Sequence, residues 1–368
     1  MALNDIAFPG NAAFFYSYLL KIAAFDPLPT DDFFDAAWNF PHSEPIGAQF
    51  GALGYETKYF AKNMGTPYLF SLIMLVCLTF IPCLNGLHAI TSLSCVKSAS
   101  NWLQEKLLWN SILVLLTENF LLIAISGCIN LTELQFSNAS TTISSVSCII
   151  FLLLLIALPI FIFRFLDKKY HVLKNKQIQA RYGSMFSKLD LNKGRLVIAV
   201  PMAFFVRRVL LSLTVVWLRG YPVFQIFITN FSVLAVIILH GQIEPYATRF
   251  ENRLETFNEL LVVGIVYHMC IFSPWVYSAQ RKYGAGWSII AITCFNIAVN
   301  ILVLLFNMIK GAINYCRKKK ELKAVKKHMD TRIKLQSYLI ARMAAQKKTG
   351  DVPEADEESK GPDQSELE

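Results

Sequence analysis

Seven stretches of apolar residues, each close to twenty residues long, constrain the fold of this chain more than any other feature. A helix needs about 20 residues to cross the ~30 Å hydrocarbon core of a bilayer. Inside lipid, only helices and closed barrels satisfy every backbone polar group. The sequence therefore predicts an all-α, polytopic transmembrane helix bundle of about seven spans. The predicted spans are residues 68–90, 107–129, 146–166, 197–218, 222–240, 258–277 and 287–309.

The composition supports a membrane protein and argues against a nucleic-acid-binding protein. Hydrophobic residues make up 54% of the 368 residues, which excludes an ordinary soluble domain. The net charge of +9 is basic enough to suggest nucleic acid. However, the Lys and Arg residues lie between the apolar stretches and after the last one, as they do in cytoplasmic loops. We therefore expect an integral membrane protein that binds no nucleic acid.

Two loops predict the orientation of the bundle. Residues 130–142, "NLTELQFSNASTT", contain no Lys or Arg and carry two glycosylation sequons, at Asn130 and Asn138. Residues 164–195 are dense in Lys and Arg. Glycosylated loops face the lumen or exterior, and basic loops face the cytoplasm. With an odd number of spans, the N-terminus is then outside or luminal and the C-terminus cytoplasmic, in the plasma membrane or an organellar membrane.

The chain divides into four predicted regions. They are a luminal or extracellular segment with a short interfacial helix (1–66), the transmembrane bundle (67–309), a basic cytoplasmic helix (310–348) and an acidic, disordered tail (349–368).

The basic helix carries apolar residues at spacings of three, four or seven. Three alternatives stay open for this stripe: homo-oligomer formation through residues 317–346, binding to anionic lipid among the membrane lipids, or exposure to solvent as a basic helix. The stripe consists of Leu322, Val325, Met329, Ile333, Ile340 and Met343.

Charged residues inside the predicted spans are the main candidates for function. A charge at the bilayer centre costs about 2.5–3.5 kcal/mol on insertion scales. Glu118, Arg207 and Arg208 lie at similar depths in the second and fourth spans. Adjacent helix residues point about 100° apart, so one arginine can face Glu118 while the other faces Glu259 or a lipid phosphate. A fixed salt bridge and a role in gating or permeation both stay open. Alternatively, the span begins near Val206 and both arginines lie at the cytoplasmic interface.

Uncharged polar residues inside the later spans form a second set of candidates. The three asparagines of the last span share one helix face, because their spacings are four and seven. Such a face lines a water-filled path or forms hydrogen bonds between helices. The set consists of Asn230, His268, Asn296, Asn300 and Asn307.

Nothing in the sequence predicts an enzyme. GxSxG, HExxH, P-loop and Gly-rich dinucleotide motifs are absent from it. The eight cysteines form no CxxC pair, so we expect packing residues, with no metal site and no cofactor. Arg207 and Arg208 are neighbours, whereas the arginines of a voltage sensor recur at every third position.

Five segments carry a family resemblance. They are "FDPLPTDDFF" (25–34), "FGALGYETKYFAKNMGTPYLF" (50–70), "ARYGSMFSKLDLNKGRL" (180–196), "FFVRRVLLS" (204–212) and "EPYATRFENRLETFNELL" (244–261). In this order they resemble the C-terminal membrane module of large surface proteins of ciliates and other protists, which is similar to TRP-like, polycystin-like membrane proteins.

The resemblance covers most of residues 5–309 and implies a TRP-like cation channel or channel-like sensor. Family members usually carry long Cys-rich extracellular repeats ahead of the module, and this sequence has none. The departure weakens a ligand-recognition role for this chain alone, and it leaves open that the chain is a fragment of a longer protein. A non-conducting surface receptor, or a membrane anchor and assembly subunit within a larger complex, stays open as the alternative function.

Overall fold

A computed structural model describes Ile6 and residues 8–24, 30–107, 110–175, 178–179, 182–186, 188–273 and 275–349. The chain forms two compact units, Met1–Asn296 and Ile297–Glu368. The predicted acidic tail lies outside the described residues, apart from its first residue, Thr349.

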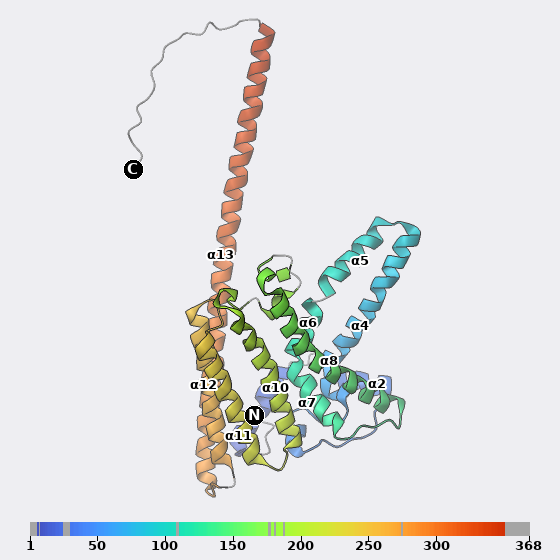
Figure 1. The fold of residues 1–368 in the computed structure, drawn as a ribbon, viewed down its shortest axis with the longest axis vertical. Coiled ribbons are helices and arrows are strands. Elements are labelled where there is room, and N and C mark those ends of the chain that lie inside the picture. Colours follow the sequence, from blue (N-terminus) through green and yellow to red (C-terminus); the bar gives the residue numbers. More distant parts are fainter. Residues whose placement is uncertain are drawn as a thin grey trace, which may run out of the picture. The chain divides into compact units, whose positions relative to one another are not determined.

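The described elements are helices and short 3-10 turns, which confirms the predicted all-α fold (Figure 1). One isolated β-bridge pairs Leu189 with Tyr246. The helices are α1 (Gly10–Ala24), α2 (Thr30–Trp38), α3 (Ala48–Ala52), α4 (Phe60–Thr91), α5 (Ser94–Leu107), α6 (Asn110–Glu118), α7 (Phe120–Leu131), α8 (Ala139–Lys169), α10 (Ala199–Trp217), α11 (Pro222–Ile243), α12 (Arg249–Phe272) and α13 (Ala279–Thr349).

Within the described residues, six helices are long and apolar enough to cross a membrane: α4, α8, α10, α11, α12 and α13. The pair α6 and α7 makes a seventh when it is counted as one span with a bend of 59°. The predicted polytopic bundle is thus confirmed. The predicted span over 107–129 is present as this bent pair, which breaks at Asn119. The predicted sixth span ends at Phe272 instead of residue 277.

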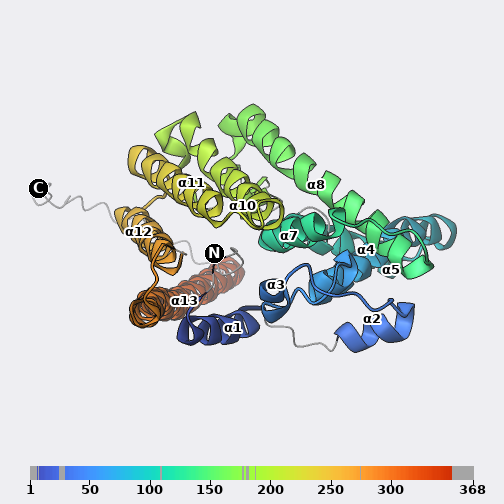
Figure 2. The ribbon, with the colours of Figure 1, turned by 90° about the horizontal axis from the view of Figure 1, so that it is seen from below.

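Neighbouring helices in the first unit pack in a clear order. Helix α7 packs on α4, α8 and α10, while α11 packs between α10 and α12. Figure 2 shows α7, α10, α11 and α12 following one another side by side. Small residues allow the closest approach, because a Cβ at Gly127 of α7 would meet the Leu152 side chain of α8 at 2.7 Å.

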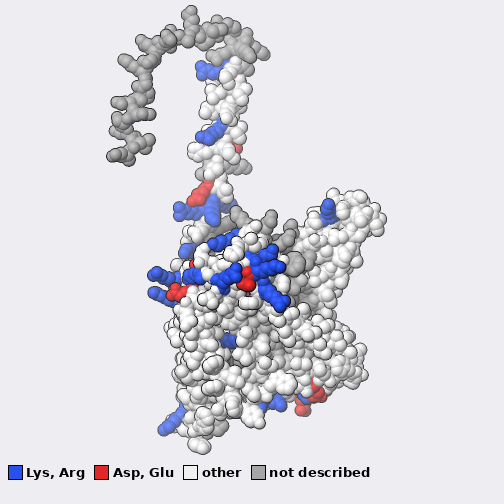
Figure 3. All heavy atoms as spheres, in the orientation of Figure 1, with Lys and Arg blue, Asp and Glu red and all other residues white. Residues whose placement is uncertain are grey.

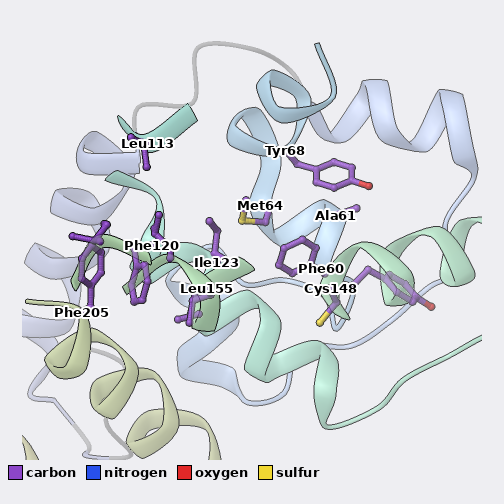
Figure 4. Close-up of a cluster of buried hydrophobic side chains, with 14 of the residues drawn as sticks. Phe60, Ala61, Met64, Tyr68, Leu113, Phe120, Ile123, Cys148, Leu155 and Phe205 are labelled. Atoms are coloured by element: carbon purple, nitrogen blue, oxygen red, sulfur yellow. The ribbon is translucent and has the colours of Figure 1, made fainter. Parts of the chain in front are cut away.

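The largest group of buried apolar side chains lies where α4, α7, α8 and α10 meet (Figure 4). Phe60, Tyr68 and Cys148 belong to it and are almost fully buried. The rings of Phe120 on α7 and Phe205 on α10 lie 4.8 Å apart between centroids. This contact fixes α10 against α7 beside the two arginines.

The basic loop before α10 is tied to the turn between α11 and α12. The Lys193 ammonium donates hydrogen bonds to the carbonyls of Glu244 (2.6 Å) and Tyr246 (3.1 Å). The Asp190 amide donates to the Pro245 carbonyl at 2.8 Å. Because the loop and the turn are joined, α10 and α12 begin at one end of the unit, and residues at similar distances along them come together.

The predicted interfacial helix is observed as α1, which packs on the first turns of α13. The Asn11 amide donates to the Tyr283 carbonyl at 3.0 Å. The hydroxyls of Tyr16 and Thr293 lie 2.8 Å apart, within hydrogen-bond distance. Helix α1 therefore belongs to the first unit and does not lie alone at the interface.

The second unit consists, in its described part, of the later residues of α13. The 71-residue helix runs without interruption through the predicted boundary between 309 and 310. From Leu304 to Met343, every side chain that the structure describes is exposed. The apolar stripe of the basic helix is thus unburied within this chain, as at Leu322 and Ile340.

Replacing Gly286 by Ala should loosen α1. A Cβ at Gly286 would collide with the Asn11 amide, which must then give up its bond to Tyr283 at a cost of about 1 kcal/mol. We expect faster amide hydrogen exchange across α1, measured by mass spectrometry. The matched control is Gly284→Ala in the same helix, where a Cβ meets no atom within 4 Å. Equal exchange in the two variants would contradict this packing.

Candidate functional site inside the helix bundle

An ion pair joins the fourth and sixth spans in the interior of the first unit. Nη1 of Arg207 lies 2.5 Å from Oε1 of Glu259. Glu259 is ten residues beyond the start of α12, about 15 Å along the helix, and therefore near the middle of a ~30 Å core. The Glu259 side chain is buried. At such a depth, a carboxylate and a guanidinium stabilise each other's charged forms.

Arg208 points away from Arg207 and contacts the second span. Its Nη1 donates to the Thr117 carbonyl at 3.2 Å. Its guanidinium carbon lies 3.7 Å from the centroid of the Phe204 ring, a cation–π contact. Glu118 is near enough to interact with it electrostatically. Arg208 thus has three kinds of partner. Of the two arginines, it is Arg208 that lies beside Glu118, while Arg207 pairs with Glu259.

The contact with Thr117 explains how the second span can break inside the bilayer. The last carbonyls of a helix have no partners within it, and Thr117 is the last residue but one of α6. The break at Asn119 involves neither Pro nor Gly. The side-chain amide of Asn119 donates a hydrogen bond to the Leu115 carbonyl at 2.9 Å. Arg208 supplies both a donor and a positive charge to the C-terminal end of α6. Broken backbone is tolerated at membrane depth when protein groups satisfy it in this way.

The two arginines face a cavity of about 610 Å³ among α6, α7, α8, α10, α11 and α12. That volume holds on the order of twenty water molecules at about 30 Å³ each. The formal charges of its lining balance, with three cations and three anions. The charged lining residues are Glu118, Lys188, Arg207, Arg208, Glu255 and Glu259.

Two buried polar atoms at this cavity have no hydrogen-bond partner within the described part of the chain. They are Oε2 of Glu259 and Nδ1 of His240. His240 lies in the last turn of α11, and its ring centroid is 6.0 Å from that of Tyr246. Because the cavity is polar and large, we expect water to enter it and satisfy both atoms.

Tyr246 lies in the turn between α11 and α12 and also lines the cavity. Burial first, and then the nearby carboxylates of Glu255, Glu251 and Glu259, together raise the pKa of its hydroxyl to about 12. The phenol therefore stays protonated at physiological pH and presents a hydrogen-bond donor to the acidic side of the cavity.

Four titratable residues that line this cavity were not among the candidates from the sequence: Lys188, His240, Tyr246 and Glu255. One signal was present, because Glu255 is four residues before Glu259 and so shares its helix face. The other three come from the basic loop, the end of α11 and the following turn, and only the folded chain brings them together.

The remaining polar candidates lie elsewhere. Nδ1 of His268 donates to the Gly264 carbonyl at 2.7 Å, so its Nε2 accepts from Ser288, whose hydroxyl oxygen is 2.9 Å away. This side chain therefore joins α12 to α13. Asn230 is half-buried in α11, and its Oδ1 has no partner among the described residues.

The predicted asparagine face crosses the boundary between the two units. Asn296 ends the first unit, while Asn300 and Asn307 belong to the second. Asn300 is half-buried and Asn307 is exposed. Asn296, Asn300 and Asn307 do not line the described cavity.

The two sequons have different environments. Asn138 is exposed, directly before α8. Asn130 lies within α7 and is only 1% exposed, and its amide donates to the Lys58 carbonyl at 2.8 Å. A glycan on Asn130 would not fit this fold, so the predicted glycosylation at Asn130 is corrected. Glycosylation at the exposed Asn138 stays a prediction.

The fold and the intramembrane charges define an integral, multi-pass membrane protein built as a helix bundle. No protein-family model, curated protein or solved structure matches the chain. The resemblance to the TRP-like, polycystin-like module therefore stays a prediction from the sequence.

The ion pair predicts a specific pattern in a double-mutant cycle. Arg207→Gln and Glu259→Gln should each destabilise the protein in detergent by about 3 kcal/mol, because each leaves a buried charge unpaired. The double variant should show a coupling energy of about 1–3 kcal/mol, measured by denaturant unfolding. The exposed pair Arg317–Glu321 (3.2 Å) is the control and should couple by about 0.3–0.5 kcal/mol. Additive effects at Arg207 and Glu259 would refute the pairing.

Glycosylation tests both the sequon assignment and the orientation. In a eukaryotic host, Asn138→Gln should abolish an N-linked glycan, whereas Asn130→Gln should leave it in place. The readout is the shift in gel mobility after glycosidase treatment. A wild-type chain without a glycan would argue against a luminal loop between α7 and α8.

Proposed function

We propose that this protein is a TRP-like, channel-like sensor that conducts cations, and that the charge cluster around Arg207 controls its opening. The observation that carries the proposal is the Arg207–Glu259 pair at the wall of a polar cavity in mid-membrane. Ionisable side chains inside a membrane typically mark ion pathways or switches.

The geometry provides a way for the cluster to switch. Glu259 uses only one carboxylate oxygen for Arg207, and the other is without a partner in the described chain. Glu255 lines the same cavity one turn away and forms no ion pair among the described residues. Arg207 therefore has a second carboxylate within its reach, and exchange between the two would move charge along α12.

The acidic side of the cavity favours cations over anions. Glu255 and Glu259 lie one turn apart on the same face of α12, and rings of acidic side chains select cations in known channels. The bend at Asn119 adds a hinge beside the arginines. A change in the contacts of Arg208 would then change the conformation of the C-terminal end of α6, where Arg208 binds the Thr117 carbonyl.

The partners and the location are part of the proposal. The exposed apolar stripe of α13 supports a homo-oligomer through residues 317–346 or a contact with anionic lipid, since a soluble helix seldom exposes such a stripe. The N-terminus faces the exterior or lumen and the C-terminus the cytoplasm, in the plasma membrane or an organellar membrane.

Reconstitution into liposomes tests conduction. The wild-type protein should pass K⁺ or Na⁺, measured as flux or as current in planar bilayers. Glu259→Gln should change the open probability about tenfold if the pair contributes about 1.4 kcal/mol to the closed state. Arg281→Gln, which removes an exposed arginine near the start of α13 and outside residues 317–346, is the control and should leave the currents unchanged. A stable protein without cation flux would overturn the proposal.

A second candidate is a non-conducting receptor or anchor subunit of a larger membrane complex. The observation that favours it is that both arginines already have partners within the bundle, as a static structure requires. Arg207 pairs with Glu259, and Arg208 contacts the Thr117 carbonyl and the Phe204 ring. In this case Glu259→Gln would lower stability, and no variant would change the permeability of the liposomes.

A further inference from the structure

We propose that a groove between α11 and α12 binds the headgroup of an anionic phospholipid, independently of whether the protein conducts ions. The groove has a volume of about 420 Å³ and is lined by the end of α11, the following turn and the first three turns of α12. It shares His240 with the charged cavity.

Two arginines at the mouth of the groove are available to a ligand. Arg249 and Arg253 are four residues apart and therefore share a helix face. Both are exposed, and neither has an ion pair or a hydrogen-bonded partner within the described part of the chain. One acidic residue, Glu244, also lines the groove, which leaves its side chains with a net positive charge. The planar guanidinium group suits bidentate binding of phosphate.

The groove lies at the level of lipid headgroups. Arg249 is the first residue of a helix long enough to cross the membrane. Figure 3 shows Lys and Arg gathered over this end of the first unit, where α8 ends and α10 and α12 begin. Lys169 and Lys193 belong to these segments. A basic surface at this level attracts anionic lipid.

The lining changes from charged to apolar along α12. Thr256, Phe257 and Leu260 line the inner part of the groove, about 10–17 Å beyond Arg249 along the helix axis. The Leu260 side chain is 56% exposed within the first unit. Phosphate followed by an acyl chain has the same order of polarity, so the groove fits a phospholipid better than a free phosphate ion.

A capping box uses two of the backbone donors at the start of α12. The Thr248 hydroxyl accepts from the Glu251 amide at 3.2 Å, and the Glu251 carboxylate accepts from the Thr248 amide and hydroxyl. The two arginine side chains are the charged donors of the groove, and binding depends on them. His240, more than nine-tenths buried, lines the groove with Nδ1 unpartnered among the described groups, so a bound lipid lies one side chain from the charge cluster.

Lipid binding to the full-length protein in detergent tests the site. Phosphatidylserine binding, followed by native mass spectrometry with phosphatidylcholine as reference, should weaken about thirtyfold in Arg249→Gln/Arg253→Gln. Arg281→Gln/Lys282→Gln removes the same charge near the start of α13, outside both the groove and residues 317–346, and should change this binding much less. Because both arginines are exposed and unpartnered, the variant should fold. The single variant Arg253→Gln, expected to lose about fivefold, provides a milder test.

Two further measurements identify the source of the phosphate. Glycerol phosphate should not displace bound phosphatidylserine, because it lacks an acyl chain to contact Phe257 and Leu260. Leu260→Ser should weaken phosphatidylserine binding and leave both arginines intact. Three results would overturn the proposal: equal binding by the wild type and the double arginine variant, equal loss in the Arg281→Gln/Lys282→Gln control, or full displacement by glycerol phosphate.

Discussion

The need to keep two arginines inside the bilayer governs how the spans of this protein pack. Arg207 is satisfied by a carboxylate 52 residues later in the chain, and Arg208 by a carbonyl 91 residues earlier. Both partners must lie at the depth of the arginines, so α10 has to contact α12 on one side and the broken second span on the other. The tie from Lys193 to the turn before α12 sets that depth, and the polar cavity forms where these charged side chains keep the apolar faces apart.

The features that depend on bilayer thickness were predictable, and those that depend on helix rotation were not. Length and hydropathy predicted the spans because a helix that crosses lipid must be apolar over about 20 residues. Sequence depth also singled out Glu118 and the two arginines, with Glu259 as a further possible partner, but neighbours on a helix point about 100° apart. Which arginine meets which carboxylate therefore depends on how α10 is rotated. The break at Asn119 could not be predicted for a similar reason. The group that stabilises it, Arg208, lies on α10, and the sequence at the break has no Pro or Gly.

The local sequence did not predict the burial and contacts of side chains where a turn folds back on a helix. The sequon at Asn130 resembles a surface loop, yet its amide is buried against the Lys58 carbonyl. His240 looks unremarkable in the sequence, although it lines both the charged cavity and the groove between α11 and α12. If the groove holds an anionic lipid, the composition of the membrane acts on the charge cluster through this one histidine.

The contact between Arg208 and Thr117 also has a consequence for assembly. The second span is synthesised long before α10. At that stage the Thr117 carbonyl cannot yet accept a hydrogen bond from the Arg208 guanidinium. An unbroken helix would then satisfy its backbone best in lipid. The second span is therefore expected to enter the membrane as a straight helix and to bend only after α10 has inserted. The kink then marks a chain whose insertion is complete. A quality-control system could use it to distinguish finished from unfinished chains.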